Sequence, residues 1–211
     1  MQAKTAILVD GGWMALELAK YLKVRYASAE QVYRNASSVL LPDEDLYRLF
    51  YYDASPYDGT QENPISRAKI DFASSPSFGG RERFFRELNA MPQVALRLGT
   101  VSFRGWQIVD EFQKKLLAGT VTTSSLSDKD IKPNLMQKGV DMRIGIDIAS
   151  MVFKKIVDRI VLFSGDTDMV PAIKLARVEG VQVVVVQMGK KSLNSKLIED
   201  SDFLRVLTPA P

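Results

Sequence analysis

Four consecutive valines, Val183–Val186, stand inside a strand pattern that extends from Val181 to Gln187. A strand with one solvated face alternates apolar and polar residues, whereas a strand of a parallel sheet is covered on both faces and reads as a nearly continuous apolar run. The valines therefore predict a strand inside a parallel sheet. Because parallel neighbours need long crossover connections, such a sheet requires helices between its strands.

The remainder of the chain shows the alternation of strands and helices that this sheet requires. Strand patterns occupy residues 5–9, 46–53, 94–103, 160–163 and 203–207, and helical patterns occupy residues 13–22, 81–91, 111–117, 140–157, 169–178 and 192–198. With 211 residues, the chain is predicted to be a single α/β domain, residues 1–211, with helices on both faces of a mostly parallel sheet.

Two stretches interrupt the alternation. Residues 53–80 are rich in proline, glycine and serine and are predicted to form a long loop insertion, with a short helix near residues 65–72. Residues 119–130 are rich in serine and threonine, which predicts a mobile loop rather than a domain boundary.

The chain contains neither histidine nor cysteine. This excludes disulfides, Ser-His-Asp and Cys-His catalysis, and metal sites built from imidazole or thiolate. Carboxylate, lysine, tyrosine and hydroxyl chemistry remain, and a metal held by oxygen would favour Mg²⁺ or Mn²⁺. The net charge of +3 is compatible with a polyanionic partner but does not identify one.

The sequence gives no indication of a membrane partner. No apolar run is long enough to span a bilayer, and Asp10 follows the start too closely for a signal peptide. A cytoplasmic location is therefore expected.

Aspartates stand at the ends of predicted strands. Asp10 ends the first strand, Asp166 and Asp168 follow the strand at 160–163, and Asp141 begins a helix. In a doubly wound sheet the carboxyl ends of the strands share one edge, where ligands bind. Carboxylates gathered there repel one another unless a cation or proton lies between them. The four aspartates together predict a metal site.

Each aspartate also has a structural interpretation. Asp141 and Asp168 could cap the helices that follow them, and Asp10 could be a turn acid. Asp53, at the end of the second strand, fits an ordinary loop acid slightly better than a ligand. Asp147 lies in an otherwise apolar helix and needs a partner, for which Arg143 is a candidate.

Four motifs, in this order along nearly the whole chain, resemble the NYN domain family, in its LabA-like branch of the PIN-like nucleases. They are Ile-Leu-Val-Asp-Gly-Gly, Phe-Tyr-Tyr-Asp-Ala, Gln-Lys-Gly-Val-Asp-Met-Arg-Ile-Gly-Ile-Asp and Ile-Val-Leu-Phe-Ser-Gly-Asp-Thr-Asp-Met-Val-Pro. The resemblance implies a PIN-like three-layer α/β/α sandwich and metal-dependent cleavage of RNA.

The same resemblance implies roles for single residues. The family's acidic cluster corresponds to Asp10, Asp141, Asp166 and Asp168, its further acids to Asp147 and Asp53, and its serine, which positions phosphate or water, to Ser164. Many members carry an asparagine two or three residues after the first aspartate, whereas here Gly11, Gly12 and Trp13 follow Asp10.

The expected mechanism is hydrolysis of RNA assisted by Mg²⁺ or Mn²⁺ bound to the four aspartates, partly through water. Basic residues expected near the same edge could contact the backbone of single-stranded RNA. These are Lys138, Arg143, Lys190 and Lys191. Trp13, Tyr57 and Trp106 could stack on unpaired bases. The alternatives are an ordinary surface position for each lysine and a core position for Trp13.

Two other functions stay open from the sequence. The Ser-Gly-Asp-Thr-Asp segment also resembles a motif of haloacid-dehalogenase-like phosphatases, but Asp10 lacks the second aspartate that those enzymes carry two residues later. The chain could instead be a catalytically weak module that binds RNA or a protein partner. Whether it forms a homo-oligomer is also open.

Overall fold

The structure, a computed structural model, describes residues 2–211. The chain forms two compact units. The first contains Met1–Asp53, Arg83–Gly99 and Gly139–Pro211, and the second contains Ala54–Glu82 and Thr100–Lys138. The prediction of one domain over residues 1–211 stays a prediction.

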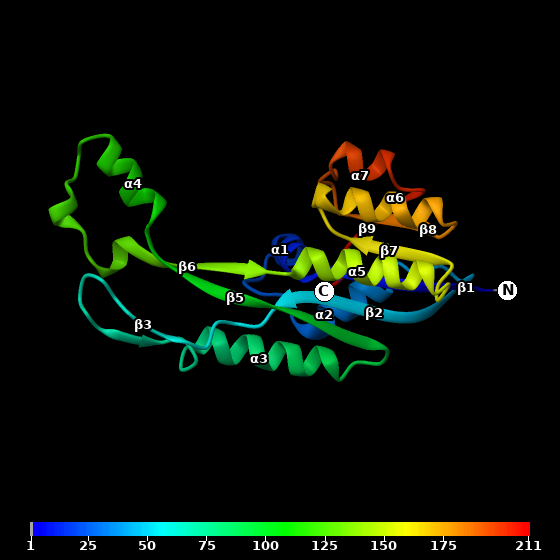
Figure 1. The fold of residues 1–211 in the computed structure, drawn as a ribbon, viewed down its shortest axis with the longest axis horizontal. Helices are drawn as coiled ribbons and strands as arrows, with labels where there is room; N and C mark the ends of the chain where they lie inside the picture. The colour runs from blue at the N-terminus through cyan, green and yellow to red at the C-terminus, as the bar shows by residue number, and fades with distance from the viewer. Residues whose placement is uncertain (1) are drawn as a thin grey trace. The chain divides into compact units, whose positions relative to one another are not determined.

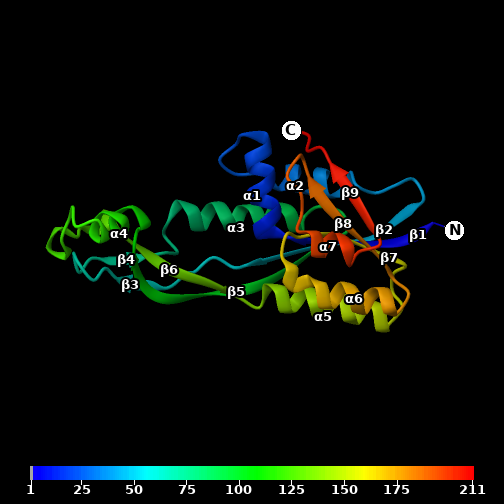
Figure 2. The ribbon, with the colours of Figure 1, turned by 90° about the horizontal axis from the view of Figure 1, so that it is seen from above.

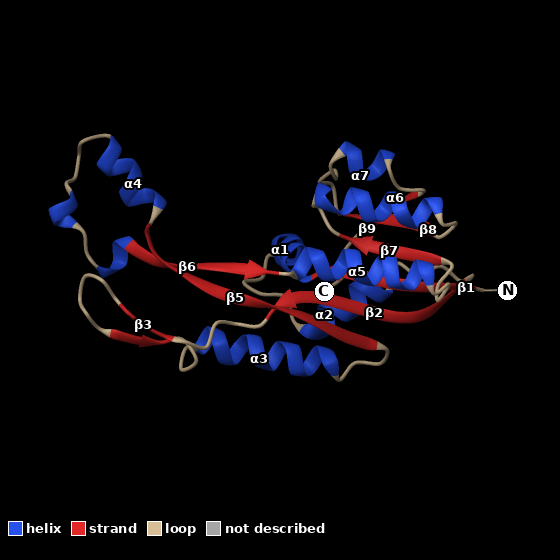
Figure 3. Ribbon diagram, viewed as in Figure 1, coloured by secondary structure: helices blue, strands red, loops and turns tan. Residues whose placement is uncertain are grey.

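The first unit is built on a parallel sheet, as the valine run predicts (Figures 1 and 3). Its parallel strands are β1 (Ala3–Asp10), β2 (Glu44–Ala54), β7 (Arg159–Phe163), β8 (Gln182–Met188) and β9 (Phe203–Leu207). The strand order is β6-β5-β2-β1-β7-β8-β9. Val183–Val186 are at most 1% exposed, which confirms that β8 is covered on both faces.

Helices cover the two faces of this sheet, as Figure 2 shows. The helices α1 (Gly11–Leu22) and α2 (Ala29–Ser37) lie on one side, and α5 (Val140–Phe153) and α6 (Val170–Val178) lie on the other. A short helix, α7 (Ser195–Glu199), precedes β9. The α/β fold class with a mostly parallel central sheet is therefore confirmed.

The second unit is built from antiparallel hairpins. Strand β3 (Thr60–Glu62) pairs with β4 (Lys69–Asp71), and the far part of β5 (Val94–Ile108) pairs with β6 (Ile131–Lys138). The helix α4 (Asp110–Leu117) and the turns Thr123–Ser125 and Asp128–Asp130 join β5 to β6. Tyr57, Phe72, Phe103 and Trp106 form a chain of ring contacts.

The structure corrects several predicted elements. No helix forms near residues 65–72, because Asn63 accepts hydrogen bonds from the amides of Ile65 and Ser66 and turns the chain into the β3–β4 hairpin. The helix expected at 81–91 is α3 (Pro76–Asn89). The helix predicted to reach residue 157 ends at Phe153, close to Lys155, whose φ of 51° is left-handed.

Candidate acidic site at the carboxyl edge of the sheet

Asp10 joins a strand to a helix. It is the last residue of β1 and the N-cap of α1, and its Oδ1 accepts a hydrogen bond from the amide of Trp13 at 3.2 Å. Its Oδ2 accepts a hydrogen bond from the Ser164 hydroxyl at 3.4 Å. Each carboxylate oxygen can accept more than one bond, so both oxygens keep the capacity to bind a further group.

The segment after β7 is held by a second set of hydrogen bonds. The amide of Asp166 donates to Ser164 Oγ at 3.1 Å, and the amide of Asp168 donates to Asp166 Oδ1 at 2.9 Å. Ser164 is 1% exposed. Its hydroxyl therefore connects the carboxylate of Asp10 to the turn that carries Asp166.

The charges of these aspartates act on one another. Burial raises the pKa of Asp10, and the negative charges of Asp141 and Asp53 raise it further, against the opposing hydrogen bond from the Trp13 amide. Partial burial, followed by the charges of Asp166 and Asp168, raises the pKa of Asp141 in the first turn of α5. The predicted acids therefore share one electrostatic environment, in which a cation would relieve their repulsion.

Asp53 is not in a loop, although the sequence fitted an ordinary loop acid slightly better than a ligand. It lies within β2, is 1% exposed, and is close enough to raise the pKa of Asp10.

The arrangement does not contain a preformed cage for a metal ion. Among residues 2–211, no three acidic side chains are grouped closely enough to hold one ion. The donor chemistry nevertheless suits Mg²⁺, which binds through one or two carboxylates, several waters and substrate phosphates rather than through an all-protein cage. These aspartates therefore suit an ion whose coordination is completed by water and phosphate.

Asp147 has partners outside this environment. Its carboxylate accepts two hydrogen bonds from Arg97, at 2.7 and 2.6 Å, and one from the Tyr52 hydroxyl at 2.9 Å. The expected pairing with Arg143 is wrong, because Arg143 Nη1 donates instead to the carbonyl oxygen of Gly139 at 2.8 Å. Asp147 thus ties α5 to β2 and β5.

The predicted basic residues differ in their surroundings. Lys191 pairs with Glu17 at 3.2 Å, so part of its charge is neutralised within the protein. Lys190 is exposed and has no charged partner among the described residues. Lys138 belongs to the second unit.

The Gly-Gly-Trp sequence after Asp10 has a packing reason. A Cβ on Gly11 would collide with the ring of Tyr51, whose hydroxyl donates to the Gly11 carbonyl oxygen at 3.3 Å. A Cβ on Gly165 would collide with Nε1 of Trp13, so the indole rests on the backbone of the Ser164–Asp166 turn. These contacts occupy the region where the family resemblance implies an asparagine.

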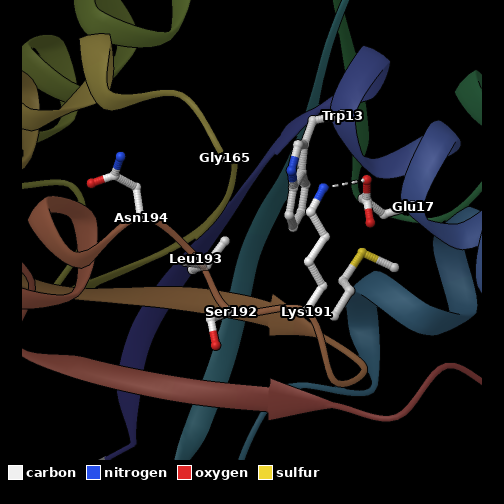
Figure 4. Close-up of a pocket in the computed structure, with 8 residues that line it drawn as sticks. Trp13, Glu17, Gly165, Lys191, Ser192, Leu193 and Asn194 are labelled. Carbon is white, nitrogen blue, oxygen red and sulfur yellow. Dashed lines mark hydrogen bonds and ion pairs between the residues drawn. The ribbon is translucent and has the colours of Figure 1, made fainter.

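A pocket of about 170 Å³ opens beside this turn (Figure 4). Trp13 and Gly165 form part of its wall, and Lys191, Ser192, Leu193 and Asn194 form another part. The sequence analysis did not predict this pocket. The sequence feature that could have indicated the pocket is Glu17, an acid four residues after Trp13 and therefore on the same face of α1.

Glu17 fixes one side of the pocket. It is 8% exposed and accepts hydrogen bonds from Lys20 at 3.0 Å and Lys191 at 3.2 Å. Burial alone would raise its pKa, but these two lysines outweigh burial and lower the pKa. The Lys191–Glu17 pair therefore attaches the loop after β8 to α1.

Comparisons with known proteins bear first on the fold of this chain and then on its family. A protein of unknown function from Vibrio parahaemolyticus RIMD 2210633 has a similar solved structure, with a TM-score of 0.54 and 13% identity over 98% of this chain and 94% of that chain. This likeness supports the α/β fold and nothing further. A comparison with curated proteins found no match.

The NYN domain family matches residues 100–207, which is just over half of the chain. The chain belongs to this family, whose members are generally nucleases. The matched residues include Asp141, Asp166 and Asp168, whereas Asp10 and Asp53 precede them. The LabA-like branch stays a prediction.

In the part of the chain that the structure describes, no helix is both long and apolar enough to span a bilayer.

Proposed function

We propose that this protein is a metal-dependent endoribonuclease that hydrolyses single-stranded RNA. The observation that carries the proposal is the proximity of four acids from three parts of the chain: the charge of Asp141 raises the pKa of Asp10, and the charges of Asp166 and Asp168 raise the pKa of Asp141. In a member of a family of nucleases, such a group of acids suits the binding of Mg²⁺ or Mn²⁺.

The four aspartates would hold the ion partly through water, with an RNA phosphate completing its coordination. Bound there, the ion would lower the pKa of the attacking water and offset the charge that develops on the leaving oxygen. Ser164 orients the carboxylate of Asp10 and, through the amide of Asp166, holds the turn in place. The N-terminus of α5, where Gly139 provides no side-chain cap, would favour the approach of a phosphate.

A binding module without catalysis is the second candidate. The observation that favours it is the lack of any three-acid group among residues 2–211. In that case the same edge would bind RNA through phosphate contacts and would leave it intact.

The test is cleavage of labelled single-stranded RNA in Mn²⁺ by the native protein, Asp166→Asn and Asp45→Asn. Asp45 is exposed at the opposite end of β2, so Asp45→Asn makes the same chemical change away from the site. We expect Asp166→Asn to cleave at least about tenfold more slowly and Asp45→Asn to cleave at the native rate.

The other outcomes are equally informative. Equal cleavage by the native protein and Asp166→Asn would remove Asp166 from the catalytic group. RNA binding without cleavage by any of the three proteins would favour the binding module. Calorimetric titration with Mn²⁺ alone reports the metal site independently, and Asp166→Asn should weaken that binding.

A further inference from the structure

The pocket beside Trp13 is adjacent to the acidic site and has no role in the hydrolysis proposed above. Trp13 is a neighbour of both, because its amide binds Asp10 while its side chain lines the pocket. Gly165, which also lines the pocket, lies between Ser164 and Asp166. A group bound in the pocket is therefore held next to the site of the proposed reaction.

We propose that this pocket binds one unpaired base of the RNA, next to the phosphodiester bond that is cleaved. The proposal rests on the proposed function, since it identifies the recognition element of that same site. A volume of about 170 Å³ is smaller than the pockets of about 300 Å³ and more that enclose drug-sized ligands. It suits a single planar base better than a complete nucleotide.

Trp13 offers the stacking surface. Its indole is only partly buried, and it lies close to the backbone of Gly165. Figure 4 shows the indole of Trp13 on one side of the pocket and Leu193 and Asn194 on the other. Aromatic side chains stack on bases of any sequence, because every base has a π-face.

Polar groups at the rim can bind the edge of a base. Asn194 Oδ1 accepts a hydrogen bond from the amide of Lys196 at 3.0 Å, which leaves the side-chain NH₂ of Asn194 available. Within residues 2–211, the Ser192 hydroxyl has no hydrogen-bond partner. Proteins that bind single-stranded RNA stack unpaired bases on aromatic side chains and form hydrogen bonds to the edges of those bases.

The pocket is preorganised. The ion pair of Lys191 with Glu17 attaches the loop after β8 to α1, and Asn194 is fixed as the N-cap of α7. A wall that is already ordered saves the entropy that binding would otherwise cost.

The test uses Trp13 as its own reporter. The chain has two tryptophans, so Trp106→Phe leaves Trp13 as the only one. This variant is titrated in EDTA with a single-stranded RNA hexamer and with six hexamers that each carry one abasic position. We expect the intact hexamer to quench Trp13 emission to saturation.

One abasic position should abolish the quench and weaken binding by about tenfold to a hundredfold, and the other five should bind like the intact hexamer. The salt dependence of binding should stay the same for all seven, because every phosphate is retained. In the matched Trp13→Phe protein, Trp106 emission should not change. Asn194→Ser keeps a side-chain cap for α7. It should weaken binding of the intact hexamer but not of the abasic hexamer that leaves the pocket empty.

The outcomes separate this proposal from the nuclease. RNA cleavage with no change in Trp13 emission, while anisotropy of a labelled hexamer shows binding, would overturn the base pocket and leave the nuclease standing. Quenching with no cleavage by any variant would support the pocket and refute the nuclease.

Discussion

Gly165 has no side chain, and it lies where the acidic turn meets the pocket beside Trp13. It lies between Ser164 and Asp166, and the indole of Trp13 occupies the space that a Cβ would need. The sequence predicted the acids of this turn because aspartates after strands follow a simple topological rule. It did not predict the indole contact, because this depends on how α1 packs against the turn in three dimensions.

Gly165→Ala should displace the indole of Trp13. The added methyl group overpacks the turn, so we expect the free energy of unfolding to fall by about 1–3 kcal/mol. Urea unfolding measures this change. Gly145→Ala is the control, because its Cβ would meet no atom and alanine favours a helix interior. It should stabilise the protein, and an equal loss in both variants would contradict the contact with Trp13.

Asp147 is predicted to matter for stability rather than for catalysis, although the family resemblance implies an acid of the site. Asp147→Asn weakens the charged hydrogen bonds to Arg97 and leaves the Tyr52 hydroxyl with a poorer acceptor. We expect unfolding in urea to become easier by about 1–3 kcal/mol, with unchanged affinity for Mn²⁺ by calorimetry. Native stability with lost Mn²⁺ binding would assign Asp147 to the metal site instead.

At the scale of elements, the sequence predicted those with strong periodicity and missed several others, among them α2 and β6. Helix α2 was missed because it is short and polar, although Ser28 and Gln31 form a capping box at its start. Strand β6 was missed because it is largely exposed and contains Pro133. Its pairing with β5 comes from a contact between distant segments, which local patterns do not report.

Three strands are joined at the amino end of the sheet by Glu44, whose side chain is fully buried between Arg159 of β7 and Arg205 of β9. Burial by itself would raise the pKa of Glu44. Hydrogen bonds from Arg205 and Arg159 outweigh burial and hold the pKa at about 2. The ionised form is therefore favoured in the folded protein.

This lowered pKa predicts a loss of stability in acid. Because the folded pKa lies below the unfolded value of 4.5, the stabilisation is complete above pH 4.5 and is lost as the pH falls toward 2. The contribution is about 3 kcal/mol. Urea unfolding between pH 6 and pH 2 measures it. Glu44→Gln should be less stable at pH 6 and should lose less stability in acid; an identical pH profile would contradict the assignment.

For the whole molecule, the valine run and the alternation of elements were enough to predict the fold class. A sheet buried on both faces leaves few other arrangements. The partition into two compact units was not predicted, because residues 54–82 and 100–138 come together only through contacts between distant segments. The local pattern of residues 53–80 therefore indicated only a loop.

The charge of the whole molecule predicts a weak dependence of RNA binding on salt. The net charge is +3, and many cations, among them Arg97, Arg159 and Arg205, are paired within the protein. Because the net positive charge is small, we expect only about two to four phosphate contacts. Since each contact with single-stranded RNA contributes about 0.7 to the slope of log affinity against log salt, the slope should lie between about −1 and −3.

Lys190 provides the sharpest check on that slope. It is exposed and unpaired among the described residues, whereas its neighbour Lys191 is held by Glu17. In anisotropy titrations at several salt concentrations, Lys190→Ala should make the slope shallower by about 0.7, the value of one phosphate contact. Lys191→Ala should change the slope less, because its charge is already partly neutralised. Equal effects of the two substitutions would contradict the difference between the two lysines. A native slope steeper than about −5 would mean that the protein makes more phosphate contacts than predicted.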